Sequence, residues 1–569
     1  MPRKLFYALA ALIFFAAIFF RHVDLSTHFV TYDDMAPIPL LLSIKAYENH
    51  RFYEPAFFFS TYNTNAPLQF LFTTQLLSPE MGYRDLVYRA RLPSFLAAIF
   101  TVILFFFFLS YFFSEIKKTK PLLFQSLVLL GTSMIAFSWM HVIYSKFSCT
   151  YAITPFFFLL MLYRLSMMAR EKKNSLKELC LTLGLLMMAC FASYQNVLFI
   201  PGFVIAVIWL AFRPLSTKAE RKKMAGQFVL LGATFGVYFY LFWKKFLAPY
   251  NTGPLAGERG PSDLFMLYLK NYEGLGAKLV RLAEYIPVNF GRILQSNLSY
   301  TEDGTNLSFV LTGFFYVFLL LGVFSWIQKR GDPLRKSLLI FSTVSIAVWA
   351  SFLLRDRMTM SPTRHQMVLI PIMILLVIEG LFFLLQMLRQ KLSLGLQALP
   401  LVFAIVLTTS FALSFPEMTK RRVDPLQEPE LIKLFQEHDV QMVFQAPNML
   451  NLAFMQDLIK QFPVVTGIWL NIKQKRPQYE AKTLAYISPG AAELSPEGFN
   501  DFVKRFNEVS EGHIWKASLA DYEVVYSRKY EGVMMDYTRY SLFQNSSTNF
   551  YILKQKPTSK AFIQPAAGQ

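Results

Sequence analysis

The chain has 569 residues, of which 54% are hydrophobic and only 16% are charged, and its formal net charge is +19. Soluble domains carry about 25% charged residues, so this composition excludes an ordinary soluble enzyme and predicts an integral membrane protein. Three cysteines, Cys149, Cys180 and Cys190, are too few for a disulfide-built secreted scaffold and form no paired-cysteine zinc pattern.

Apolar runs recur along the first 414 residues, and a membrane helix needs roughly 20 such residues. The first run is interpreted as an uncleaved anchor, because Arg21 follows it directly and no small-residue cleavage site is present. Only Tyr194-Gln195-Asn196 and Pro201 separate the fifth run from the sixth. We expect eleven spans, at 5–20, 93–113, 121–138, 150–168, 179–194, 197–212, 226–243, 308–327, 337–354, 367–387 and 396–414.

Lys and Arg gather in alternate loops between these spans, for example at Arg221-Lys222-Lys223 and at Lys172-Lys173. This bias predicts a cytoplasmic N-terminus. Because it reflects topology beside anionic lipid, the positive charge does not call for a nucleic-acid partner. An odd number of spans then places the loops 21–92 and 244–307 and the C-terminal part outside the cytoplasm.

The pattern divides the chain into a multi-span membrane domain, 1–414, and an extracytoplasmic C-terminal domain, 415–569. In the second domain the spacing predicts a helix at 431–437, and the final residues, 557–569, are expected to be frayed. A small α/β or α+β fold fits this part. Strands are expected at 440–444, Val464–Thr466, 522–526 and 550–553.

Two adjacent acids, Asp33 and Asp34, lie about a dozen residues beyond the first span and therefore near the outer interface. Ionised groups close to hydrocarbon are costly and usually serve a function, and a carboxylate in such a place can act as a base. Asp34 could instead cap a helix at 37–49. The two roles are compatible if one acid caps the helix and the other faces a cavity.

Further segments follow the acidic pair in a characteristic order: Asn65-Ala66-Pro67-Leu68, Arg91-Leu92-Pro93-Ser94, the turn 141–151, and 361–365. This order resembles the GT-C glycosyltransferases that use polyprenyl-phosphate sugars. The similarity is to the glycosyltransferase family 39 type, which includes protein O-mannosyltransferases and the lipid A aminoarabinose transferase. The chain departs from the pattern at Asp34, where many relatives have Glu, and in its reduced Pro-Pro-Leu segment.

The resemblance implies an α-helical GT-C membrane protein that transfers a glycosyl group from a polyprenyl-phosphate sugar to an acceptor hydroxyl at the outer face, with inversion. Asp33 would be the general base, and Asp34 would orient the acceptor or Asp33. Arg91 and Arg364 would bind the phosphate leaving group, because the planar fork of arginine donates two hydrogen bonds to one phosphate. Interfacial snorkelling is the other interpretation of each cation. The second choices for phosphate binding are Arg89, Lys146 and His365.

No metal is expected, although some GT-C enzymes use a divalent ion. The sequence shows no His-x-x-x-His spacing, and two carboxylates alone make a poor site for a hard ion. The expected partners are the polyprenyl-phosphate sugar and an acceptor that is a lipid, a glycan or a protein, in a multi-pass protein of the plasma (inner) membrane.

Two other functional classes stay open at this point. A transporter or flippase would show paired halves with broken spans, which the sequence lacks, and a non-catalytic scaffold would not explain the acidic pair. Glu379, toward the inner half of the tenth span, is either functional or within reach of the interface. The loop 244–307 could gate a cavity or act as a spacer.

Overall fold

A computed structural model describes residues 1–23, 25–26, 67–77, 81, 83–148, 150–171, 175–244, 274–298, 306–354, 364–388, 394–420, 428–445, 458, 461–466, 481–489, 494–509, 513–534 and 544–565. Asp33 and Asp34 and the expected helix at 37–49 lie outside these described residues.

Helices dominate the described residues as far as Lys420. They are α1 (Arg3–His22), α5 (Pro67–Leu76), α6 (Tyr83–Phe112), α7 (Pro121–Ala136), α8 (Trp139–Tyr144), α9 (Ile153–Glu171), α10 (Leu176–Ala192), α11 (Ile200–Phe212), α12 (Lys218–Phe242), α15 (Leu275–Leu298), α16 (Asn306–Gln328), α17 (Pro333–Leu354), α18 (Ile370–Met387) and α19 (Leu394–Lys420). Short 3-10 turns join some of them: η1 (Ser114–Ile116), η2 (Tyr194–Phe199) and η4 (Arg364–Leu369).

Nine stretches of the described chain are long and apolar enough to cross a membrane, by length and composition. The chain is therefore a multi-pass membrane protein, with nine such helices in the described part where the sequence predicts eleven. The two that fall short are α7 and α10, with 16 and 17 residues. The predicted break between the fifth and sixth spans is confirmed, since η2 separates α10 from α11.

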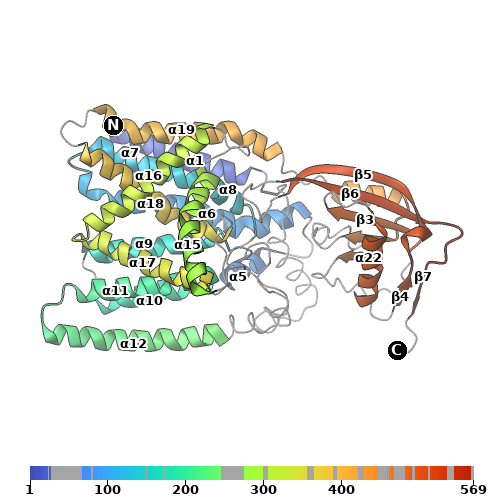
Figure 1. Ribbon diagram of the computed structural model, residues 1–569, viewed down its shortest axis with the longest axis horizontal. Helices are drawn as coiled ribbons and strands as arrows, with labels where there is room; N and C mark the ends of the chain where they lie inside the picture. The colour runs from blue at the N-terminus through green and yellow to red at the C-terminus, as the bar shows by residue number, and fades with distance from the viewer. Residues whose placement is uncertain are drawn as a thin grey trace.

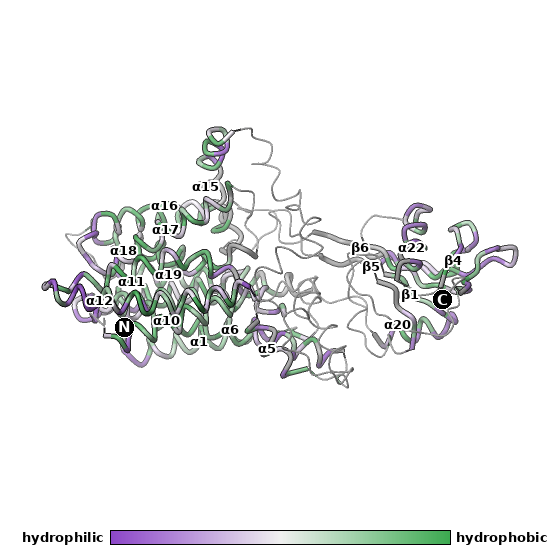
Figure 2. The backbone as a smooth tube through the Cα atoms, turned by 90° about the horizontal axis from the view of Figure 1, so that it is seen from below, coloured by the Kyte–Doolittle hydropathy of each residue, from purple (hydrophilic) through white to green (hydrophobic). Residues whose placement is uncertain are grey.

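The long helices lie side by side, and one end of the bundle carries the N-terminus while the strands of the C-terminal part lie beyond the other end (Figure 1). Figure 2 shows hydrophobic residues along the helices and hydrophilic ones at the end with the N-terminus. Buried side chains from α1 and from α6 through α19 form one apolar core. Within it, the rings of Phe20 and Phe137 lie 5.0 and 5.4 Å from that of Phe411, which ties α1 and α7 to α19.

Two helices correct the expected boundaries. α6 begins at Tyr83, about ten residues before the expected span, so Pro93 lies inside the helix and Arg91 lies within it rather than before it. α15 occupies part of the expected loop 244–307 and runs crosswise to the spans (Figure 1). Its Leu279 is exposed while Leu282 is buried, as expected for an amphipathic helix on the bundle surface.

The helices α16 and α18 approach each other very closely. An ideal Cβ at Gly322 would overlap the carbonyl oxygen of Leu376, and one at Gly380 would overlap the carbonyl oxygen of Phe318. Small residues let the backbones of membrane helices come together in this way. Only glycine therefore fits at these two positions.

The C-terminal part is a small α+β unit. Its five-stranded sheet has the order β2-β1-β3-β6-β5, in which β1 pairs in parallel with β2 and β3 and the remaining pairs are antiparallel. A two-stranded sheet pairs β4 with β7. The strands are β1 (Met442–Gln445), β2 (Val464–Thr466), β3 (Thr483–Pro489), β4 (His513–Lys516), β5 (Tyr522–Met534), β6 (Gln544–Gln555) and β7 (Phe562–Pro565), with α20 (Glu428–Glu437), α22 (Pro496–Val509) and the 3-10 turn η6 (Leu519–Asp521).

The core of this unit centres on Trp515. Asn507 of α22 accepts a hydrogen bond from the Trp515 backbone N–H at 2.6 Å and donates one to its carbonyl at 3.1 Å. The ring of Trp515 lies against Phe444 of β1 and Phe499 of α22. This packing fastens the helix and the small sheet to the large one.

The predicted fold class, a helical membrane protein with a small C-terminal α/β or α+β part, is confirmed. The four predicted strands and the predicted helix correspond to β1, β2, β5, β6 and α20, although β5 and β6 are longer than expected. The expectation of a frayed end at 557–569 is wrong for β7, because that strand pairs with β4 in antiparallel register, with Lys516 opposite Phe562.

Candidate functional site

The short helix α8 is the meeting point of the elements that carry the predicted site residues. All six of its residues are buried, and it contacts α1, α6, α7, α15 and η4. It therefore brings the C-terminal end of α1 close to α6, which carries Arg91, and to η4, which begins with Arg364. We treat this region as the candidate site.

Arg21, at the end of α1, is fully buried. Its Nη1 donates to the carbonyl oxygens of Ala17 at 3.1 Å and Ala136 at 2.7 Å, and its Nη2 donates to that of Ile135 at 3.3 Å. Ile135 and Ala136 close α7, whose C-terminal carbonyls carry partial negative charge. These carbonyls compensate the buried guanidinium, and no carboxylate among the described residues pairs with it.

His141 of α8 receives the remaining hydrogen bond from Arg21, at 2.9 Å between Nη2 and Nδ1. A guanidinium only donates hydrogen bonds, so Nδ1 must accept and the neutral ring must carry its proton on Nε2. Burial, and then the charge of Arg21, hold the pKa of His141 well below its usual range. Its Nε2 is buried and has no hydrogen-bond partner in the described part of the chain. The pair thus presents a fixed, neutral N–H donor.

Two further predicted cations hold the chain just after α1. Arg91 is fully buried and donates from Nη1 to the carbonyl oxygen of Leu25 at 2.9 Å. Lys146, also fully buried, donates from Nζ to the carbonyl oxygen of Val23 at 2.6 Å and lies 5.3 Å from the ring centre of Phe415. Both cations therefore fix the start of the segment that leads to Asp33 and Asp34.

The structure places the other predicted residues less completely. Arg89 is exposed on α6. Arg364 and His365 are the first two residues of η4, and their side chains lie outside the described atoms. Of the seven predicted residues, Arg91 and Lys146 are thus brought together around the end of α1, and no described side chain tests the roles of Asp33 and Asp34.

An apolar cavity of about 300 Å³ lies between α15, α16, α17 and α18. Leu369, the last residue of η4, is part of its wall, so the cavity adjoins the turn that begins with Arg364. The wall is almost entirely apolar. It includes Phe158, Phe199, Phe290, Phe341, Trp349 and Met373.

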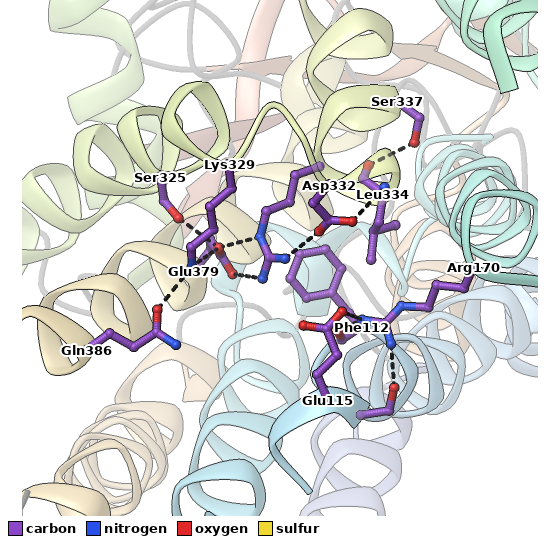
Figure 3. A network of polar contacts seen from close by, with 12 residues as sticks. Phe112, Glu115, Arg170, Ser325, Lys329, Asp332, Leu334, Ser337, Glu379 and Gln386 are labelled. Atoms are coloured by element: carbon purple, nitrogen blue, oxygen red, sulfur yellow. Dashed lines mark hydrogen bonds and ion pairs between the residues drawn. The ribbon is translucent and has the colours of Figure 1, made fainter. Parts of the chain in front are cut away.

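A second charged cluster contains Glu379, which is fully buried in α18 (Figure 3). Its Oε1 accepts hydrogen bonds from Arg335 Nε and from Ser325 Oγ, both at 2.8 Å. Lys329 Nζ lies 3.5 Å from the same oxygen, and Asp332 pairs with Arg335 at 2.5 Å. We call Ser325, Lys329, Asp332, Arg335 and Glu379 the inner network. Both of its carboxylates face a cation, so Glu379 is an ionic partner in the packing of α16, α17 and α18.

The inner network continues to a second pair on neighbouring helices. Arg335 lies over the ring of Phe112, with 5.4 Å between its Cζ and the ring centre. Arg170 of α9 pairs with Glu115 of η1 at 3.2 Å (Figure 3). These contacts connect α17 and α9 to the end of α6, which agrees with a structural role for the cluster.

Within the described residues no group of three or more His, Cys, Asp or Glu side chains could hold a metal ion. Asp33 and Asp34 lie outside that search. The expectation that no metal is needed therefore stays a prediction.

Sequence reasoning missed Arg21 and His141 as site residues. One signal was available for Arg21, because a cation at the expected outer end of a span runs against the positive-inside bias. No local signal identifies His141, because its partner is 120 residues away in the chain.

No protein-family model matches the chain, and no curated protein matches it either. Comparison with solved structures finds similarity to ArnT from Cupriavidus metallidurans. The apo form is 12% identical with a TM-score of 0.47, covering 96% of this chain and 97% of that chain. The form bound to undecaprenyl phosphate is 12% identical with a TM-score of 0.46, covering 100% and 99% of the two chains. Both TM-scores lie below 0.5, so these similarities establish neither a shared fold nor a shared activity.

Proposed function

We propose that the chain is a glycosyltransferase of the GT-C type, which moves a sugar from a polyprenyl-phosphate donor to an acceptor hydroxyl. It would work at the extracytoplasmic face of the plasma (inner) membrane, with a cytoplasmic N-terminus and the C-terminal part outside. Asp33 would accept the proton of the acceptor hydroxyl while the hydroxyl oxygen bonds to the anomeric carbon from the face opposite the phosphate. This displacement inverts that carbon, and Asp34 would orient the acceptor.

The apolar cavity beside η4 is the observation that carries this proposal. A polyprenyl tail needs an apolar groove between helices, and its phosphate needs cations at the polar end of that groove. The cavity has an apolar wall, and that wall includes Leu369 of η4. The resemblance of 361–365 assigns Arg364, the first residue of the same turn, to the leaving phosphate, with His365 as a second choice.

The remaining donors of the site fit the same chemistry. Arg91 and Lys146 are buried cations that donate to carbonyl oxygens, at 2.9 and 2.6 Å, at the start of the segment that leads to Asp33. The Nε2–H of His141 would donate to an oxygen of the phosphate or of the sugar. Its fixed tautomer suits binding rather than proton transfer.

The test begins with mass spectrometry of envelope lipids, glycans and proteins from cells with and without the chain. A molecule that carries an additional sugar mass only in cells with the chain is the acceptor, and the size of that mass identifies the class of donor. In a reconstituted assay with that acceptor, Asp33→Asn should then lower the transfer rate about 10²–10⁴-fold, the usual contribution of a general base. The variant should keep the thermal midpoint of the unchanged protein.

Asp85→Asn is the matched control, because Asp85 is an exposed acid in the first turn of α6. It should transfer sugar at the normal rate. An Asp33→Asn variant with full activity would remove Asp33 from the role of base. If no sugar mass depends on the chain, the proposed reaction is wrong.

Filling the cavity tests the donor site separately. Val323 lines the cavity, whereas Ile327, one turn further along α16, is an exposed hydrophobic residue outside it. Val323→Trp should raise the KM for the lipid-linked donor, and Ile327→Trp should not. Equal KM values for the two variants would place the lipid tail elsewhere.

A further inference from the structure

Two basic side chains from different helices gather on one tryptophan ring near the ends of α11 and α17. Trp209 lies in the last turn of α11, and Arg213 follows that helix directly. The Cζ of Arg213 is 6.0 Å from the centre of the Trp209 ring, and the Nζ of Lys336, in the first turn of α17, is 5.0 Å from it. α11 and α17 pack against each other, so the arrangement joins two neighbouring helices.

Neither cation has an acidic partner among the residues whose placement is described. Arg170, in the last turn of α9, differs, because its Nη2 lies 3.2 Å from Oε1 of Glu115. Asp332 is the acid nearest to Lys336 in sequence, but its carboxylate already pairs with Arg335 and accepts a hydrogen bond from the backbone N–H of Leu334. The positive charges of Arg213 and Lys336 beside the Trp209 ring are therefore not neutralised within the described part of the protein.

Apolar surface lies directly beside this charge. Ile205 and Ile208, on the same helix as Trp209, are 46% and 37% exposed. Tryptophan is enriched where the headgroup region meets the hydrocarbon. The order along α11, exposed isoleucines, then tryptophan, then an exposed arginine, matches the order of a phospholipid from acyl chain to phosphate.

We propose that Trp209, Arg213 and Lys336 form a binding site for the phosphate of an anionic phospholipid. The guanidinium of Arg213 and the ammonium of Lys336 bind the phosphate oxygens by charge-assisted hydrogen bonds. The indole of Trp209 holds both cations in place and covers the glycerol region, and the first acyl carbons lie on Ile205 and Ile208. This site is independent of the proposed sugar transfer.

The experiment uses the full chain purified in a mild detergent. Phosphatidylglycerol or phosphatidylcholine is titrated in, and bound lipid is counted by native mass spectrometry while the thermal midpoint is followed. The double variant Arg213→Gln, Lys336→Gln is compared with Lys222→Gln, Lys223→Gln. The second pair removes the same charge from exposed lysines of α12 that are not placed against Trp209.

The unchanged protein should retain phosphatidylglycerol, but not phosphatidylcholine, and should be stabilised by it. The Arg213/Lys336 variant should bind phosphatidylglycerol about 30-fold more weakly, since each of the two basic residues at an anionic surface contributes about 1 kcal/mol and each 1.4 kcal/mol is tenfold in affinity. The Lys222/Lys223 variant should bind normally.

Equal weakening in both double variants would show a general charge effect and overturn the site. Unchanged binding in the Arg213/Lys336 variant would overturn it as well. Full competition by inorganic phosphate would mean that the group binds a free anion rather than a lipid. Because no sugar transfer is measured, the result does not depend on the proposed reaction.

Discussion

The region around α8 and the inner network of Glu379 bury charge in two different ways. In the inner network the positive charges of Arg335 and Lys329 face Glu379, and Arg335 also faces Asp332. Around α8, Arg21 is held by carbonyl oxygens and by a neutral imidazole. A neutralised cluster can stabilise helix packing but has little left to offer a ligand. A cation held only by neutral acceptors keeps its field, and this favours an anion nearby.

The largest effect on stability should come from the inner network. Glu379→Leu leaves the buried Arg335 with Asp332 as its remaining acid and the half-buried Lys329 without one, and breaking a buried pair from one side typically costs about 3–5 kcal/mol. The free energy of unfolding, measured by denaturant titration in detergent, should fall by that amount.

The Glu379→Leu protein that does fold should transfer sugar at the normal rate. Glu379→Gln should be milder, because its amide oxygen still accepts from Arg335. A stable but inactive Glu379→Leu protein would contradict the contrast between the two regions.

Lys146→Met should combine a smaller loss of stability with a loss of transfer. The variant removes the hydrogen bond to Val23, and such a bond from a charged donor contributes about 1.5–3 kcal/mol. Because Lys146 also supports the segment leading to Asp33, the turnover rate should fall more than the stability alone explains. Lys146→Arg, which keeps the charge, should recover part of the rate.

Variants of His141 distinguish its contact with Arg21 from its proposed role as a hydrogen-bond donor to the sugar donor. His141→Gln keeps an acceptor for Arg21 and an N–H group beyond it, so transfer should stay close to normal. His141→Leu removes both, costs about 1.5–3 kcal/mol for the lost hydrogen bond from the charged Arg21, and should raise the KM for the donor. If the Leu variant showed only lower stability and an unchanged KM, the donor role of Nε2 would be excluded.

His141 should also make the stability of the chain depend on pH. Burial and the charge of Arg21 hold the pKa of His141 below its usual range in the folded chain. Below about pH 6.5 the unfolded chain therefore binds a proton that the folded chain does not, and stability falls as the pH falls, by up to ~1.4 kcal/mol per pH unit. His141→Gln should show a shallower decline between pH 7 and 5, and an identical decline would contradict the burial of a neutral imidazole.

The sequence predicted what depends on local pattern. Apolar runs located the spans, and even the narrow break between α10 and α11 followed from Tyr194-Gln195-Asn196. Alternating runs located β1, β2, β5 and β6, because each of these strands carries its own apolar pattern.

The prediction missed β3 and α22, although both have apolar patterns of their own, and it also missed features that depend on contacts between distant residues. β7 is ordered by pairing with β4, about 50 residues earlier in the chain, and with only four residues it has too little pattern of its own to predict a strand. In the sequence, Arg21 is a basic residue that flanks the first apolar span. Only the packing of α1 on α7 and α8 makes it a buried partner of His141. The roles of Asp33 and Asp34 rest on resemblance, since they lie outside the described residues.

The contact between Gly322 and Gly380 has a consequence for any lipid that enters the cavity. The carbonyl that Gly322 meets belongs to Leu376, which is itself part of the cavity wall. A single added methyl group at either glycine would therefore push α16 away from α18 and change the width of the cavity. These two residues therefore set the distance between α16 and α18 and, with it, the width of the cavity, although neither is part of the cavity wall.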